Sequence, residues 1–143
     1  MSDIRWQGST AGEGSEGAAP RPPRVILVGP CASGKSTVAR ALRARGIDAH
    51  AVAQEHSVVP ALWRHLEPDL LVYLDVEYGT VRRRRRISWG PGRLEAQKAA
   101  LAPARWAAGL YVPTDGLTVD QVVARILQEL ERAHPAKPGC PRA

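Results

Sequence analysis

Residues 24–36 of the chain read RVILVGPCASGKS, and this stretch decides the fold. Its first part, residues 24–28, contains a short continuous apolar run that is typical of a strand buried on both faces. Residues 29–36 then match the pattern G-x-x-x-x-G-K-[S/T] at every fixed position. The next residues, 35–45, are predicted to form a helix that closes at Gly46. A strand, a glycine-rich loop and a helix in this order predict a cradle for the phosphates of a nucleotide.

The chemistry of a phosphate cradle requires this spacing. Glycines let the backbone turn tightly and present successive N–H groups to an anion. Lys35 would place its ammonium group against the β- and γ-phosphates, and Ser36 would offer its hydroxyl to Mg²⁺. The helix that begins here would also point its positive end at the phosphates. We therefore expect Mg-ATP to be bound by Gly29, Ala32, Ser33, Gly34, Lys35, Ser36 and Thr37.

The rest of the chain alternates strand and helix patterns. Strands are predicted at residues 48–53, 69–76 and 110–112, and helices at residues 58–66, about 77–86 and 94–106, with a last helix that begins at residue 118 and has its apolar face over residues 119–130. Ser57 is expected to cap the first of these helices, and Thr118 with Gln121 forms a capping box for the last. Alternating strands and helices imply parallel pairing through right-handed crossovers. The predicted fold class is α/β: a three-layer α/β/α P-loop NTPase sandwich around a small parallel sheet of four to five strands.

Length and composition limit the organisation of the chain. Its 143 residues suit one domain, which we place at residues 24–134. Residues 1–23 are rich in Gly, Ser, Ala, Pro and Glu and are expected to be a disordered arm, and residues 135–143 a Pro-rich tail. The net charge of +6 favours anionic partners, but a small phosphate ligand and a nucleic acid would both satisfy it.

Two cysteines, Cys31 and Cys140, are too few for a disulfide framework, and a bridge between them is not expected. No stretch is apolar enough to span a membrane, and the N-terminus lacks the pattern of a signal peptide. A cytoplasmic location without a membrane partner is the resulting expectation.

From about residue 24 to residue 130, the loop and the order of elements resemble the P-loop kinases of small molecules. This broad group includes adenylate, shikimate and adenylylsulfate kinases. The resemblance implies an acidic residue at the end of an early strand, here Glu55. It also implies an arginine-bearing helix, here with residues 82–86, and a lid, here residues 87–93, whose arginines contact the transferring phosphate.

Within the same resemblance, residues 111–116, YVPTDG, would be the last strand and the turn near the adenine. The chain also departs from that group. It has no segment long enough for a separate monophosphate-binding domain, its lid is short, and four strands are clear where five are usual. These departures leave open the identity of the acceptor and the retention of transfer chemistry.

Two carboxylates lie at the ends of predicted strands, and Glu55 comes just past the second strand, at the edge where open α/β sheets bind ligands. Glu55 would act as base for an acceptor hydroxyl or as an outer-shell partner of the metal, and the alternative is a solvated loop carboxylate. Asp75 ends an apolar strand of the Walker B kind and would hold Mg²⁺, and the alternative is a helix-capping role.

Five consecutive arginines, Arg82 to Arg86, cannot all point the same way from a helix. Arg82 and Arg86 share a face, and Arg86 adjoins the short lid, so these two are the predicted phosphate contacts. The alternative is a solvated basic face.

The sequence is compatible with three functions. The first is a small-molecule kinase that transfers the γ-phosphoryl group of Mg-ATP to a nucleotide or other metabolite, with Lys35, Glu55, Arg82 and Arg86 as its catalytic residues. The second is a nucleotide-binding regulator or slow ATPase without an acceptor. A nucleic-acid-binding module ranks last, because the chain has no basic surface interleaved with aromatic residues.

Overall fold

Four parallel strands form one sheet in a computed structural model that describes residues 21–57 and 61–133. The strands are β1 (Arg24–Val28), β2 (Asp48–Ala51), β3 (Leu70–Asp75) and β4 (Leu110–Pro113), in the spatial order β2-β1-β3-β4. β1 lies inside the sheet, with Val25 beside Ala49 on one side and beside Leu70 on the other. All strands run in the same direction, so their carboxyl ends meet at one edge. The expected α/β class with a small parallel sheet is confirmed.

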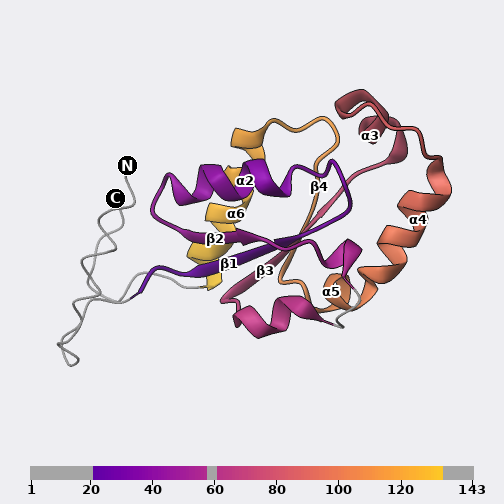
Figure 1. Ribbon diagram of the computed structural model, residues 1–143. Helices are drawn as coiled ribbons and strands as arrows, with labels where there is room; N and C mark the ends of the chain where they lie inside the picture. Colours follow the sequence, from indigo (N-terminus) through magenta and orange to yellow (C-terminus); the bar gives the residue numbers. More distant parts are fainter. Residues whose placement is uncertain (1–20, 58–60, 134–143) are drawn as a thin grey trace.

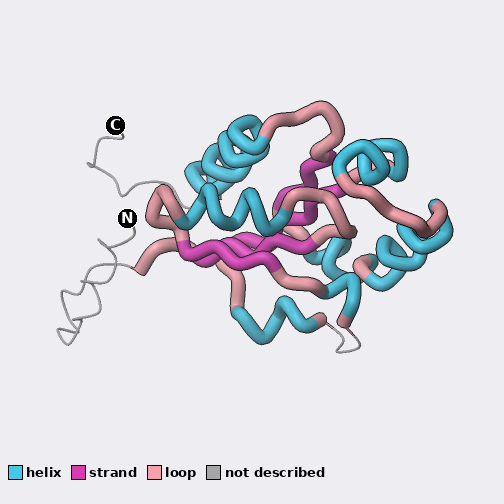
Figure 2. The backbone as a smooth tube through the Cα atoms, turned by 45° about the horizontal axis from the view of Figure 1, so that its top comes forward, coloured by secondary structure: helices cyan, strands magenta, loops and turns pink. Residues whose placement is uncertain are grey.

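Helices cover both faces of this sheet (Figures 1 and 2). On one face, α2 (Lys35–Arg43) and α6 (Val119–Ala133) pack against a cluster that includes Val25 and Leu27. On the other, η3 (Leu62–Leu66) and α5 (Ala102–Ala107) pack against a cluster that includes Ile26 and Val28. The alternation follows from the pleat, which sends successive side chains of a strand to opposite faces. Because both faces are covered, β1 is apolar and buried from Val25 to Val28.

Two further helices, α3 (Tyr78–Arg84) and α4 (Pro91–Ala100), lie beyond the carboxyl ends of the strands (Figure 1). A third cluster of buried side chains, from Val76, Val81 and Leu94, joins them to that edge. Partly buried Trp89 packs on the same cluster. The segment predicted to be a lid is therefore anchored by its own small apolar core.

The predicted helix after Ser57 is wrong in the part of the chain that is described. Residues 54–56 form a 3₁₀ turn, η2 (Gln54–His56), and Ser57 ends that turn. The next helical segment, η3, is also 3₁₀, and it lies between Ala61 and Glu67, whose φ angles are 50° and 51°. Left-handed residues on both sides stop the segment from extending into an α-helix.

Other predicted helices differ at their ends. The basic helix stops at Arg84, because Arg85 is extended, with a φ of −139°. The helix expected at residues 94–106 begins earlier, at Pro91, which suits the first helical position because its missing N–H needs no partner there. It then divides into α4 and α5 at Leu101. Pro103 explains the division, since it cannot donate to the carbonyl of Ala99.

The predicted tail, residues 135–143, lies outside the described residues, as does Cys140. The predicted arm is described only from Arg21, and Pro23 at its end accepts a hydrogen bond from the Asp48 amide at 3.2 Å. Within residues 21–57 and 61–133, no helix has the length and apolar character needed to cross a membrane.

Candidate functional site

Residues 29–36 connect β1 to α2 at the carboxyl edge of the sheet and are called the 29–36 loop below. Ala32 and Gly34 both have left-handed backbones, with φ angles of 64° and 93°. The Ser33 amide closes a tight turn by donating to the Pro30 carbonyl at 3.2 Å. The amides of the first turn of α2 follow directly, and such amides have no partner inside a helix. This combination of a tight turn and a helix N-terminus is suited to holding an anion.

The 29–36 loop lies tightly against the neighbouring strand. A Cβ atom on Gly29 would stand 2.2 Å from the Leu74 carbonyl oxygen and 2.8 Å from Ser33 Oγ. The first of these obstacles is backbone, so it cannot rotate away. The glycine that opens the motif is thus required by close packing on β3.

Lys35 forms an ion pair with Glu55, with 2.6 Å between Nζ and Oε2. The side chain of Lys35 is 12% exposed and that of Glu55 only 2%. Lys35 comes from the first turn of α2, and Glu55 comes from η2, after β2. They meet because β1 and β2 are adjacent parallel strands that end at the same edge. The Oε1 atom of Glu55 is buried and has no hydrogen-bond partner among the described residues.

A pocket of about 320 Å³ opens beside the loop and brings several of the predicted residues together. Its lining consists of Cys31, Ala32, Gly34, Lys35, Ser36, Thr37, Glu55, His56, Arg84 and Arg85. The charged and hydroxyl groups in this lining could bind phosphate through Lys35 and the arginines, and Ser36 could offer oxygen to a hard cation.

A second pocket of about 310 Å³ adjoins the first and shares Gly34, Thr37 and Arg84 with it. Its other lining residues are Ser33, Val38, Thr114, Leu117, Thr118, Val119 and Val122, from α2, the turn after β4 and the start of α6. A mostly apolar pocket thus lies directly beside one that is lined by charged and hydroxyl groups.

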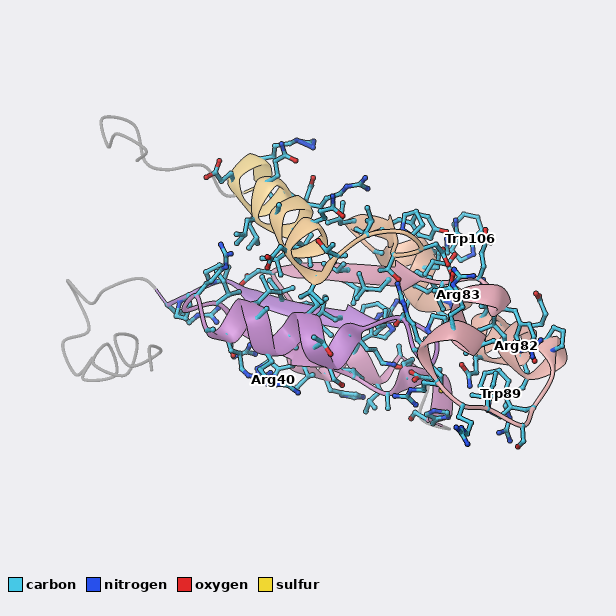
Figure 3. The ribbon with its side chains drawn as sticks, turned by 90° about the horizontal axis from the view of Figure 1, so that it is seen from above. Arg40, Arg82, Arg83, Trp89 and Trp106 are labelled. Carbon is cyan, nitrogen blue, oxygen red and sulfur yellow. The ribbon has the colours of Figure 1, made fainter. Side chains whose placement is uncertain are left out.

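Within the arginine run, Arg84 reaches the 29–36 loop. Its Nη1 atom donates to the Ala32 carbonyl at 2.8 Å, and its Nη2 atom donates to the Thr114 carbonyl at 2.8 Å. Arg82 and Arg86, the two predicted contacts, are exposed and do not line the pocket. Figure 3 shows Arg82 and Arg83 at the end of the molecule formed by α3, with Arg40 on α2 lying apart from them.

Asp75, predicted to hold Mg²⁺, is engaged elsewhere. Its Oδ1 atom pairs with Lys98 Nζ at 3.1 Å, and its Oδ2 atom accepts a hydrogen bond from the Tyr111 hydroxyl. Burial, and next the hydrogen bond to Asp75, raises the pKa of Tyr111 to about 12. Arg105 also stacks on the Tyr111 ring, 4.2 Å from its centre. The structure thus places Asp75 in a polar cluster with α4 and β4 and does not bring it to the pocket with Ser36.

Gln97 is a site residue that the sequence did not indicate. Its side chain is buried, accepts a hydrogen bond from the Cys31 amide at 2.9 Å and donates to Cys31 Sγ at 3.3 Å. On the other side, Cys31 Sγ lies 3.4 Å from His56 Nε2. No sequence signal separates a Gln that binds a distant loop from a solvated Gln in an Ala-rich helix. Likewise, no sequence signal distinguishes Arg84, which contacts the 29–36 loop, from the other four arginines of the run.

Comparison with known proteins adds no family assignment. No protein-family model matches the chain, and no curated protein matches it.

Proposed function

We propose that the chain binds Mg-ATP as a P-loop protein and transfers its γ-phosphoryl group to a small acceptor, as a small-molecule kinase does. One observation carries this proposal: the 29–36 loop, Lys35, Ser36, Glu55 and Arg84 converge on a single pocket. A loop that only turned the chain would not need a lysine beside a buried carboxylate and an arginine that approaches it from another helix.

The two adjoining pockets suit the two ends of a nucleotide. The phosphates would lie against the loop amides, Lys35 and Arg84, and the base would enter the more apolar hollow. Ser36 would hold Mg²⁺, which would supply charge neutralisation at the phosphates. Lys35 would exchange its contact with Glu55 for the phosphates, and this exchange would leave the Glu55 carboxylate facing the reacting group.

That position gives Glu55 a role in transfer. An acceptor oxygen would form a bond to the γ-phosphorus while the bond from phosphorus to the β,γ-bridging oxygen breaks. ADP would leave, and the acceptor proton would pass to the Glu55 carboxylate. Lys35 and the nearby arginines would stabilise the charge on the transferring group.

The test is ADP formation from Mg-ATP with a panel of nucleoside monophosphates and other small acceptors. Lys35→Ala removes the proposed phosphate contact, and Arg40→Ala is the matched control because Arg40 is exposed on the same helix. The kinase would be established if ADP forms with one acceptor in the parent protein and in Arg40→Ala, and does not form in Lys35→Ala.

If ATP binds through Lys35 and no acceptor accelerates ADP release, the chain is the nucleotide-binding regulator or slow ATPase. Binding of nucleic acid that persists in Lys35→Ala and collapses with added salt would instead favour the nucleic-acid module.

A further inference from the structure

Three side chains of different chemistry meet in the lining of the pocket beside the 29–36 loop. Cys31 comes from the 29–36 loop, and Glu55 and His56 come from η2. Their sulfur, oxygen and nitrogen atoms all lie within 4.8 Å of one another. Of these three residues, the proposed kinase mechanism uses only Glu55. It assigns no role to the Cys31 thiol or the His56 imidazole.

Two of the three spacings between these atoms match those of neighbouring ligands around one metal ion. In a tetrahedral zinc site, the known metal–ligand distances place neighbouring nitrogen, oxygen and sulfur ligand atoms about 3.3 to 3.6 Å apart. The Cys31 Sγ to His56 Nε2 distance is 3.4 Å, and the His56 Nε2 to Glu55 Oε2 distance is 3.6 Å. The same imidazole nitrogen faces both partners, so it is the atom that would bind the ion.

The surroundings of the three residues also suit a metal. Gln97 donates to Cys31 Sγ at 3.3 Å, and hydrogen bonds of this kind orient metal-binding side chains. The hydrogen bond between Cys31 and His56 would by itself explain their contact. It does not involve Glu55, whose Oε2 atom lies 3.6 Å from the same imidazole nitrogen.

We propose that Cys31, Glu55 and His56 bind a thiophilic divalent cation, for which Zn²⁺ is the natural choice. Thiolate and imidazole ligands favour zinc over magnesium, so this site is chemically distinct from the hydroxyl of Ser36. Three protein ligands leave a fourth position open, as in zinc sites that also bind water or a small ligand.

Lys35 is the competitor of the metal. Its ammonium group contacts the Glu55 oxygen that faces His56, at 2.6 Å, so the ion must displace Lys35 from that oxygen. This competition predicts opposite changes in metal affinity for two kinds of variant, which a general disruption of the site would not produce. Removing the lysine charge should strengthen metal binding, whereas removing a ligand should weaken it.

The first test is titration of the full chain with Zn²⁺ and Co²⁺ in the absence of nucleotide, in a Cys140→Ser background that removes the other thiol. We expect bound Co²⁺ to show thiolate-to-metal charge-transfer absorption. Cys31→Ser should abolish this absorption, and Cys31→Ser and His56→Ala should each weaken Zn²⁺ binding at least about tenfold. His65→Ala, at an exposed histidine on η3, is the matched control and should bind metal normally.

The second test is Lys35→Ala in the same background. We expect this variant to bind Zn²⁺ several-fold more tightly. Unchanged or weaker binding would contradict the participation of Glu55. Equal Zn²⁺ affinity in the parent, Cys31→Ser and His56→Ala proteins, all shown to be folded by circular dichroism, would overturn the site altogether. Because no nucleotide is present, either result is independent of the proposed kinase activity.

Discussion

At the residue scale, Lys35 and Glu55 form a largely buried ion pair in the pocket beside the 29–36 loop. Both side chains are largely removed from water, so each charge depends on the other for compensation. The pair also restrains Lys35. In the proposed function, the phosphates would have to offer Lys35 a better partner, and nucleotide binding and the release of Glu55 would then be a single event.

Breaking this pair should destabilise the fold. Lys35→Met leaves the Glu55 carboxylate buried and uncompensated, so we expect the free energy of unfolding at neutral pH to fall by about 3 kcal/mol. The double variant Lys35→Met/Glu55→Gln removes both charges and should recover a large part of that loss. Urea unfolding of the two single variants and the double variant gives the coupling energy. Strictly additive effects would show that the two charges do not stabilise one another.

At the element scale, α3 is attached at both ends to parts of the site. At its start, the Glu77 amide donates to Asp115 Oδ1 at 3.0 Å. At its end, Arg84 binds the 29–36 loop and Thr114. The helix therefore links the loop to the turn after β4, which line the two adjoining pockets.

Arg84 should consequently influence nucleotide binding more than Arg82, which lies outside the pocket. Arg84→Ala removes charged hydrogen bonds to the Ala32 and Thr114 carbonyls and a cation from the pocket, so we expect affinity for Mg-ATP to fall by roughly tenfold. Arg82→Ala removes the same charge at an exposed position outside the pocket and should leave the affinity nearly unchanged. Calorimetric titration of both variants makes the comparison. Equal losses would indicate a general effect of net charge.

The start of α3 should make stability sensitive to acid. Burial acts to raise the pKa of Asp115, but hydrogen bonds from the Glu77 amide, the Thr80 side chain and its own backbone, together with the charge of Arg84, outweigh it and hold the pKa below its usual 3.8. A lowered pKa in the folded state means that this contribution is complete above pH 3.8 and is lost as the pH falls through the folded value.

Asp115→Asn removes the titration, so the decline in unfolding free energy below pH 3.8 should become shallower in this variant. Urea unfolding from pH 6 to pH 2.5 measures the difference. Asp120→Asn is the control, since Asp120 is an exposed aspartate in the first turn of α6. An acid decline as steep as that of the parent protein would contradict the role of Asp115.

Elements with a strong local pattern were predictable from the sequence. β1 was placed at residues 24–28 because its apolar run is continuous, and the start of α6 followed from the capping box of Thr118 and Gln121, which the structure contains. The segment after Ser57 also has helical periodicity, yet it is 3₁₀ where described. Periodicity reports which side chains face the core, and it does not reveal the left-handed residues that end a helix.

Site residues that belong to one short motif were predictable from the sequence. Site residues that reach the pocket through tertiary packing were not. The motif supplied the residues of the 29–36 loop, and the order of strands placed Glu55 near them. The positions of Arg84, Gln97 and Asp75 depend on how α3, α4 and β4 meet the loop, over separations of dozens of residues. No local pattern encodes such contacts.

At the scale of the whole molecule, the sheet order places β1 between β2 and β3, so the 29–36 loop emerges with neighbours on both sides. η2 follows β2 on one side, and α3 follows β3 on the other. The two adjoining pockets are lined by residues from several segments that are distant in the sequence. A ligand that fills both pockets would connect these segments and would bind only the folded chain.

Mg-ATP should therefore raise the thermal unfolding midpoint. At a free concentration 100 times its Kd, a ligand specific for the folded state adds about 2.7 kcal/mol to stability, which corresponds to a shift of several degrees for a chain of this size. Adenosine, which lacks phosphates, should give a much smaller shift at the same concentration, and Lys35→Ala should lose most of the response to Mg-ATP. The Arg40→Ala variant should keep it. Differential scanning fluorimetry measures all four conditions, and an equal shift in Lys35→Ala would mean that the nucleotide binds away from the 29–36 loop.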